Sequence, residues 1–152
     1  MALDPSFIGR TYPATEPYLV SREKIREFAT AIGDHNPAYH LVEAAQALGY
    51  ADVVAPPTFL VILGQRSSAQ VVFDPELGLD YSRVVHGEQS FTYNRPVVAG
   101  DRLVAVGSVA NIRSAAGNDL LTLSSAVTTV DGELVCTVGS TIVARGTAEG
   151  EG

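Results

Sequence analysis

The sequence predicts an α+β protein in which a long antiparallel sheet wraps around one central apolar helix. Residues 84–144 contain four long runs rich in β-branched residues and separated by turn signals, whereas helical patterns precede them. The run from Phe59 to Leu63 is apolar on every side, which is typical of a helix buried in most directions. Helices followed by strands indicate the α+β class, and a lone buried helix needs the sheet as its cover.

The first 50 residues predict an arm and two helices. Residues 1–20 contain three prolines and little periodicity, so we expect an irregular arm with a short strand near residues 18–20. Ser21 is a suitable helix N-cap. An apolar stripe at helical spacing follows it as far as Gly33, where we expect the helix to end. A second, short helix is expected over residues 42–48.

The central helix is expected to run from Pro57 to about Val72. Proline is tolerated in the first helical turn because the N–H groups there have no partner within the helix. The apolar run alone could also be a strand, but the double proline before it and the polar residues 65–69 after it favour a helix. Strands are expected over residues 84–93, 102–112, 120–130 and 134–144, with Asp131-Gly132 as a hairpin turn between the last two.

Length and charge restrict the possible functions. A chain of 152 residues suits one domain, which we place at residues 1–146, followed by a Gly- and Glu-rich tail, 147–152, expected to be disordered. The formal net charge is −7 and the basic residues are scattered. This pattern argues against nucleic acid and anionic membranes as partners, because both need clustered positive charge.

Cysteine usage and hydropathy predict a cytoplasmic protein. The single cysteine, Cys136, lies in an apolar alternating run, so a buried structural thiol is the favoured interpretation over a reactive one, and no disulfide is possible within the chain. The N-terminus lacks the pattern of a signal peptide. No run of about 20 apolar residues is present that would span a bilayer.

The segment from Gly33 to His40 is the candidate functional site, because two histidines, a carboxylate and an asparagine crowd into eight residues. Asn36-Pro37 prevents a helix from continuing, so Asp34 and His40 leave a helix end on a fixed path. An acid and a base held towards one small volume are what general acid–base catalysis needs. The same residues are also ordinary components of a helix end and a turn with solvated side chains.

Four segments together resemble a known family. The segment Gly33 to His40 resembles the hydratase-2 signature of the MaoC-like (R)-specific enoyl-thioester hydratases and dehydratases. Three segments are similar to the chain-binding half of the double hot-dog hydratases, and to the small actinobacterial subunits related to fatty-acid-synthase dehydratases: Pro57-Thr58-Phe59 with Gly64-Gln65, Val85-His86-Gly87-Glu88-Gln89 and Tyr93-Asn94-Arg95-Pro96. The resemblance covers about residues 7–145 and implies a single hot-dog fold.

The resemblance also implies a reaction. Asp34 and His40 would hold one water and add it to, or remove it from, a trans-2-enoyl thioester, giving an (R)-3-hydroxyacyl thioester, while Asn36 orients the pair or the thioester carbonyl. No metal or other cofactor is implied. The implied partners are an acyl-CoA or acyl-carrier thioester and a second hot-dog subunit, in a homodimer or a heterodimer. The residues implied for substrate binding are Thr58, Phe59, His86, Gly87 and Gln89.

Two departures from the family pattern keep other functions open. Two residues, Ala38 and Tyr39, separate Pro37 from His40, where the family has one. Active members carry His-Gly at the start of the central helix, and the glycine N–H polarises the thioester carbonyl. This chain has Ala55-Pro56-Pro57 there, and proline has no N–H. The alternatives are a non-catalytic acyl-chain-binding subunit of a heterodimeric dehydratase and a hot-dog thioesterase.

Overall fold

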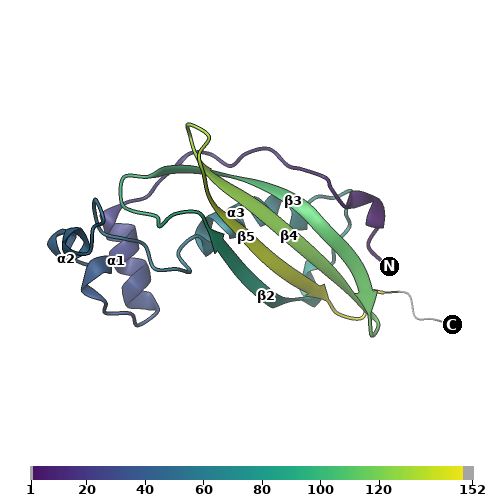
Figure 1. Cartoon of the computed structure of the whole chain (residues 1–152). Helices are drawn as coiled ribbons and strands as arrows, with labels where there is room; N and C mark the ends of the chain where they lie inside the picture. The colour runs from purple at the N-terminus through teal and green to yellow at the C-terminus, as the bar shows by residue number, and fades with distance from the viewer. Residues whose placement is uncertain (1, 149–152) are drawn as a thin grey trace.

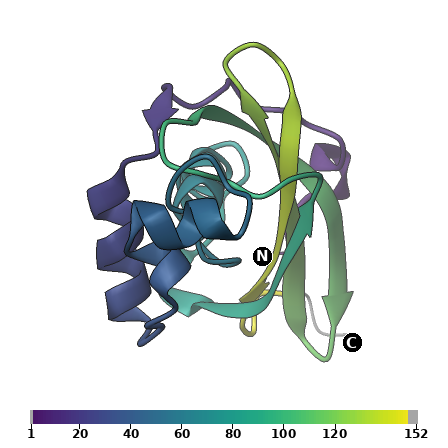
Figure 2. The ribbon, with the colours of Figure 1, turned by 60° about the vertical axis from the view of Figure 1, so that its left-hand side comes forward.

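The computed structural model, which describes residues 2–148, confirms the predicted α+β architecture. A five-stranded antiparallel sheet curls around the helix α3 (Val61–Val72), and two shorter helices cover one end of the sheet (Figure 1). Turned by 60°, the molecule shows α3 lying inside the curve of the sheet (Figure 2). The apolar run therefore forms the centre of the fold, as its lack of a polar face predicts.

The sheet has the strand order β1-β3-β4-β5-β2, with antiparallel neighbours throughout. β2 and β5 have the predicted bounds. β3 and β4 are longer than predicted because Ala116 and Gly117, both with positive φ (51° and 77°), make a two-residue turn between them. The strands are β1 (Tyr18–Leu19), β2 (Val84–Tyr93), β3 (Arg102–Ala115), β4 (Asn118–Thr129) and β5 (Leu134–Ala144).

The predicted helices before the centre of the chain are also present. The Ser21 side chain accepts a hydrogen bond from the Lys24 N–H at 3.1 Å and so caps α1. Gly33, at φ +74°, ends this helix and directs the chain into the candidate site. The helices are α1 (Arg22–Ala31) and α2 (Val42–Ala47), with short 3₁₀ turns η1 (Pro5–Phe7), η2 (Pro37–Tyr39) and η3 (Tyr81–Arg83).

The start of the central helix is a correction, because α3 begins at Val61 and not at Pro57. The residues before it make tight turns: Phe59 N donates to Pro56 O at 2.9 Å and Val61 N donates to Thr58 O at 3.1 Å. Two adjacent prolines explain this, since neither has an N–H and Pro57 disfavours the helical region for Pro56. The segment in which the helix was expected to begin therefore forms a constrained turn.

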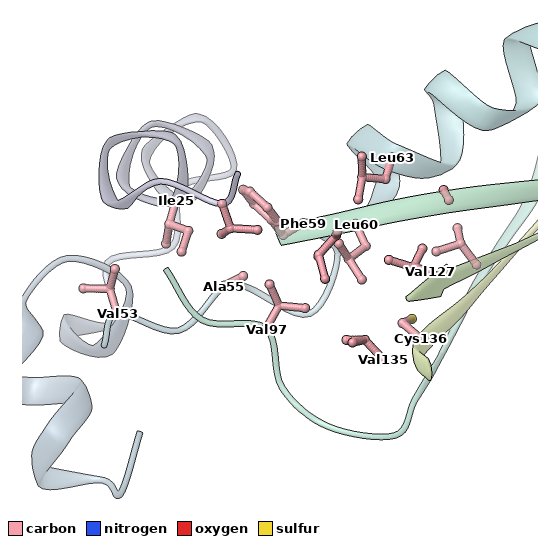
Figure 3. Close-up of a cluster of buried hydrophobic side chains, with 14 residues drawn as sticks. Ile25, Val53, Ala55, Phe59, Leu60, Leu63, Val97, Val127, Val135 and Cys136 are labelled. Atoms are coloured by element: carbon pink, nitrogen blue, oxygen red, sulfur yellow. The ribbon is translucent and has the colours of Figure 1, made fainter. Parts of the chain in front are cut away.

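The main core lies where α1, the turn before α3 and the sheet meet (Figure 3). Phe59 is fully buried in it and packs edge-on against Phe28, with ring centroids 5.4 Å apart. Cys136 is also fully buried, and burial raises the pKa of its thiol, so the predicted structural role fits its environment. This core lies at the same end of the molecule as the candidate site and holds α1 and the turn before α3 in place there.

Thr147, the first residue of the predicted tail, contacts the domain. The Thr147 hydroxyl donates to Asp119 Oδ2 at 2.6 Å, and the buried Asp119 accepts a second bond from Ser114 Oγ at 2.9 Å. Thr147 therefore belongs to the folded domain, because it helps to satisfy a buried carboxylate. The rest of the predicted disordered tail, residues 149–152, lies outside the described residues.

The two long edges of the sheet differ. The N-terminal arm runs along β3, where Tyr12 N donates to Gly107 O and Thr15 N to Ala105 O, both at 2.9 Å. Figure 1 shows the arm crossing the sheet to reach α1. β2 pairs with β5 on one side only, and no other strand of residues 2–148 covers its outer edge. β2 is therefore the edge at which another chain can add to the sheet.

Candidate functional site

The loop from Asp34 to His40 is held by its own hydrogen bonds. The Asp34 carboxylate accepts from the Asn36 N–H at 3.1 Å, and the Asn36 side chain accepts from the Ala38 N–H at 3.1 Å. His40 Nε2 lies 3.1 Å from the main-chain oxygen of Asp34. Because a carbonyl oxygen only accepts, His40 Nε2 must carry a proton in this contact. The half-buried Asp34 and His40 are thus neighbours, but the imidazole meets the Asp34 backbone rather than its carboxylate.

The loop is also attached to α1 at both ends. Asp34 N donates to Ala29 O at 2.8 Å, and Arg26 Nε donates to His40 O at 2.8 Å. Arg26 is in turn paired with Glu23 one turn earlier on the helix. These contacts fix the positions of Asp34 and His40 relative to α1.

A first cavity, of about 420 Å³, lies beside the turn that precedes α3. Asn36, Tyr39 and Asn94 contribute to its lining, as do Pro57 and Tyr93. The Tyr93 hydroxyl donates to Pro57 O at 2.6 Å and so joins the end of β2 to the turn before α3. The cavity wall is therefore built from three segments that are far apart in the sequence.

The expectation that Asp34 and His40 face one cavity beside the central helix stays a prediction. Neither residue lines the first cavity, whereas Asn36 does. The reason is local, since the Asp34 carboxylate closes the turn to Asn36 and His40 Nε2 is directed at the Asp34 carbonyl. Asn36 is the one member of the predicted trio that is in a position to contact a molecule in this cavity.

The backbone donors next to the first cavity are few. Ala55 N donates to Val97 O at 2.8 Å, and Phe59 N donates to Pro56 O. Pro56 and Pro57 have no N–H. The Thr58 N–H has no acceptor among residues 2–148, unlike the N–H groups of Ala55 and Phe59. Thr58 is also exposed. Thr58 does not belong to the lining of the first cavity, although its neighbour Pro57 does.

A second cavity, of about 590 Å³, extends along α3 on the side of β2 and β5. Small residues create the space: Gly64, Ser68 and Ala69 on α3 face Ser140 on β5. A Cβ atom on Gly64 would stand 2.8 Å from Cγ1 of Val138, so glycine is required for this approach of helix and sheet. His86 and Gln89, both predicted from the sequence, line this cavity.

Thr58 lines neither cavity, and two further predicted substrate-binding residues also have other surroundings. Phe59 is fully buried in the core and lines neither cavity. Gly87 lies at a register shift between His86 and Glu88 in the pairing of β2 with β5, which makes it the extra residue of a β-bulge. A Cβ on Gly87 would stand 3.1 Å from Val143 Cγ2. Both residues therefore shape the fold around the cavities instead of lining them.

The family resemblance included Gly64 and Gln65 of α3, but sequence reasoning did not single out Ser68 or the other α3 residues that line the second cavity. Gly64, Gln65 and Ser68 share one helix face, and the signal that marks them is small and polar residues at helical spacing inside an apolar helix. Among the described residues, no group of three or more His, Cys, Asp or Glu side chains could hold a metal ion. In the same part of the chain, no helix has the length and hydropathy needed to cross a membrane.

Comparison with known proteins identifies relatives along nearly the whole chain. The model of the family described as "FAS1-like, dehydratase domain region" matches residues 6–138. A UPF0336 protein of Saccharopolyspora erythraea is 60% identical over 149 residues, which is 98% of this chain and 96% of that protein. A UPF0336 protein of Streptomyces avermitilis is 57% identical over 150 residues, 99% of this chain and 100% of that protein.

Solved structures show the same fold. A chain of the HadBC (3R-hydroxyacyl-ACP dehydratase) complex of Mycobacterium tuberculosis is 33% identical, with a TM-score of 0.80 over 90% of this chain and 96% of that one. A MaoC-like dehydratase is 36% identical, with a TM-score of 0.86 over 92% of this chain but 42% of that longer one. An (R)-hydratase of A. caviae, 18% identical with a TM-score of 0.65 over 89% of this chain and 94% of that one, shares the fold.

Proposed function

We propose a function from the following premise: this chain belongs to the FAS1-like dehydratase family, whose model covers residues 6–138. It is one hot-dog subunit of a hydro-lyase that reversibly hydrates trans-2-enoyl thioesters of coenzyme A or an acyl carrier to (R)-3-hydroxyacyl thioesters. Its own part in that assembly is to bind the acyl chain. The acid–base pair comes from a related hot-dog subunit.

One observation carries this division of labour: Asn36 lines the first cavity, and Asp34 and His40 do not. An acid and a base that act on one water must both reach it. Here Asp34 Oδ1 accepts from the Asn36 N–H, and His40 Nε2 contacts Asp34 O, within their own loop. The prolines at 56 and 57 add to this, because they remove two N–H groups from the place where a thioester carbonyl would be polarised.

The two cavities support an acyl-binding role. The first lies beside the turn that precedes α3, and the exposed Thr58, whose N–H has no acceptor among residues 2–148, directly follows the lining residue Pro57. The second follows α3, whose 12 residues span about 18 Å, and has Val61, Val138 and Ile142 in its lining. Apolar walls along a groove of this length suit a fatty acyl chain.

The uncovered edge of β2 supports a second subunit. Nine residues of this strand are paired on one side only, and large apolar side chains on it and beside it are exposed: Val85 to 40%, Tyr81 to 59% and Phe73 to 65%. An unpaired edge next to apolar surface favours association with another sheet. The similarity to a chain of the HadBC complex is consistent with a related hot-dog partner.

A second candidate function is catalysis by this chain itself, with Asp34 and His40 as the pair. The contact of 3.1 Å between His40 Nε2 and Asp34 O favours it, because it keeps both residues within one short loop. Catalytic hydrogen bonds are often loose before substrate binds and tighten in the complex. A change of the His40 rotamer on binding would be needed to bring the two functional groups together.

Enoyl-thioester hydration by the purified chain, alone and co-purified with a related hot-dog dehydratase subunit, tests the proposal. We expect the chain alone to bind crotonyl and longer enoyl thioesters without turnover, and the assembly to hydrate them. Turnover by the chain alone would establish the second candidate. An assembly that hydrates short and long thioesters no better than the partner subunit alone would contradict the acyl-binding role.

A further inference from the structure

A hydrogen-bonded relay fixes the polar end of the second cavity. Gln89 Nε2 donates to the main-chain oxygen of Gly139 at 2.9 Å, so the amide nitrogen must lie on that side. Gln89 Oε1 then faces His86 Nε2 at 3.0 Å. Because this oxygen only accepts, His86 must donate from Nε2. The main-chain oxygen of Gly139 on β5 therefore sets the orientation of the Gln89 amide. The Gln89 amide in turn sets the tautomer of His86.

The relay leaves a hydrogen-bond acceptor available in the cavity. A neutral imidazole protonated at Nε2 has an unprotonated Nδ1, which accepts. No group among residues 2–148 bonds to His86 Nδ1, and the His86 side chain is exposed. His86 also belongs to the lining of the second cavity. The lining of the cavity therefore includes a histidine whose Nδ1 has no hydrogen-bond partner among residues 2–148.

This acceptor lies far from the start of α3. Val138 touches the Gly64 position in the first turn of the helix, whereas His86 stands opposite Ile142 in the strand register. Val138 and Ile142 are four residues apart on β5, which corresponds to about 13 Å along a strand. Ser140, opposite Gln89, lies between them and adds a hydroxyl to the lining.

We propose that this groove selects acyl chains that carry a hydroxyl group remote from the thioester, with His86 Nδ1 accepting the hydrogen bond of that hydroxyl. The inference rests on the proposed function, since it places the thioester at the start of α3. A purely alkyl chain would leave the fixed acceptor without a donor where water is displaced, which costs binding free energy. A chain with a hydroxyl at this depth satisfies it.

Binding of two matched probes tests this. The pantetheine thioesters of dodecanoic acid and ω-hydroxydodecanoic acid are titrated calorimetrically into the protein, with its partner subunit bound where one co-purifies, at about pH 8, where imidazole is neutral. We expect the hydroxylated probe to bind about three- to ten-fold more tightly, the effect of one net hydrogen bond. His86→Leu should remove the preference and still bind the dodecanoyl probe.

The matched control is His35→Leu, the same substitution at an exposed histidine that lines neither cavity, and it should keep the preference. Equal affinity of the wild type for both probes, or a preference that survives His86→Leu, would overturn the inference and leave the acyl-binding role intact. Failure of the wild type to bind either probe would overturn both.

The tautomer gives a second measurement that needs no ligand. Imidazole ¹⁵N chemical shifts should show His86 protonated at Nε2 in the wild type, and Gln89→Leu should abolish that single-tautomer state. A wild-type His86 protonated mainly at Nδ1 would contradict the inference, because the cavity would then present a donor.

Discussion

Ser67 of α3 lies directly against Gly107 of β3. A Cβ atom on Gly107 would stand 2.5 Å from Ser67 Oγ and 3.4 Å from Ser67 O. Ser67 is fully buried, and its hydroxyl has no hydrogen-bond partner among the described residues. Glycine at position 107 is thus what lets the middle of the central helix approach β3.

Gly107→Ala should destabilise the protein by about 1–3 kcal/mol, the usual cost of overpacking a core. Ser67→Ala should be neutral or stabilising, because it removes a buried hydroxyl that has no partner. The double variant should lose less than the sum of the two, since alanine at 67 removes the atom that clashes. Urea denaturation measures all three free energies of unfolding, and strict additivity would contradict the contact.

Phe59→Ala should cost about 3–5 kcal/mol of stability, because Phe59 is a fully buried core residue next to Phe28. Thr58→Ala, one residue earlier and exposed, is the control and should change stability little. Thermal or urea unfolding distinguishes them. A folded, equally stable Phe59→Ala protein with weakened acyl binding would restore the substrate-binding role implied by the family motif.

The arm is held to the loop after α3 by a pH-sensitive contact. The Tyr12 hydroxyl donates to Asp74 Oδ2 at 2.7 Å, and this hydrogen bond lowers the pKa of Asp74. Burial raises the pKa of Tyr12 to about 12, and the same hydrogen bond contributes to the rise. The stabilisation by ionised Asp74 is present at neutral pH and lost as pH falls through its lowered pKa, below about 4. The stabilisation that protonated Tyr12 contributes is present below about pH 10 and is lost as the pH rises through about 12.

Tyr12→Phe should therefore lower stability at neutral pH and weaken the acidic dependence that Asp74 contributes. Denaturant unfolding at a series of pH values measures this. The control is Tyr81→Phe, an exposed tyrosine whose hydroxyl makes no side-chain hydrogen bond among residues 2–148. Parallel stability–pH curves for wild type and Tyr12→Phe would show that the contact is not formed in solution.

Asp34→Asn should leave hydration by the two-subunit assembly within a few-fold of wild type. The substitution keeps the side-chain oxygen that accepts from the Asn36 N–H, so the loop should be retained. Steady-state kinetics of the assembly gives the result. A loss of about 100-fold or more, with His40→Ala doing nearly the same, would establish Asp34 and His40 as the acid–base pair, since groups that act as a unit are not additive.

If the chain associates through β2, arginine substitutions at two similarly exposed residues should affect dimerisation differently. Val85 on β2 and Leu134 on β5 are exposed to 40% and 41%. Val85→Arg should weaken dimerisation, because it puts a charge beside the uncovered edge, and Leu134→Arg should not. Sedimentation velocity over a range of concentrations measures this. A wild-type mass near that of one 16.0 kDa chain at every concentration would contradict association altogether.

Several elements could be predicted from local sequence because their causes are local. Ser21 caps α1 through the backbone three residues later, and Asp131-Gly132 turns β4 into β5. Runs of β-branched residues between such turn signals favour an extended strand, and β2 and β5 have the predicted bounds. The α+β class follows from the order of these elements, and the family resemblance rests on short motifs within them.

The start of α3 and the roles of single residues could not be predicted in this way. The motif predicted that Asp34 and His40 face one cavity, but it did not predict their hydrogen bonds within the loop. Gly87 became a bulge and Phe59 a core residue, because each depends on strands or helices distant in the chain.

The sequence by itself determined which elements form, their order and the family, since propensity, capping and turn chemistry act within a few residues. Only the tertiary structure decided which side chains share a cavity. His86, Gly64 and Ser140 line the second cavity because the sheet curls around α3, and Asn36 lines the first cavity together with Pro57 and Tyr93. Those arrangements depend on packing between segments up to about eighty residues apart, which no local pattern encodes.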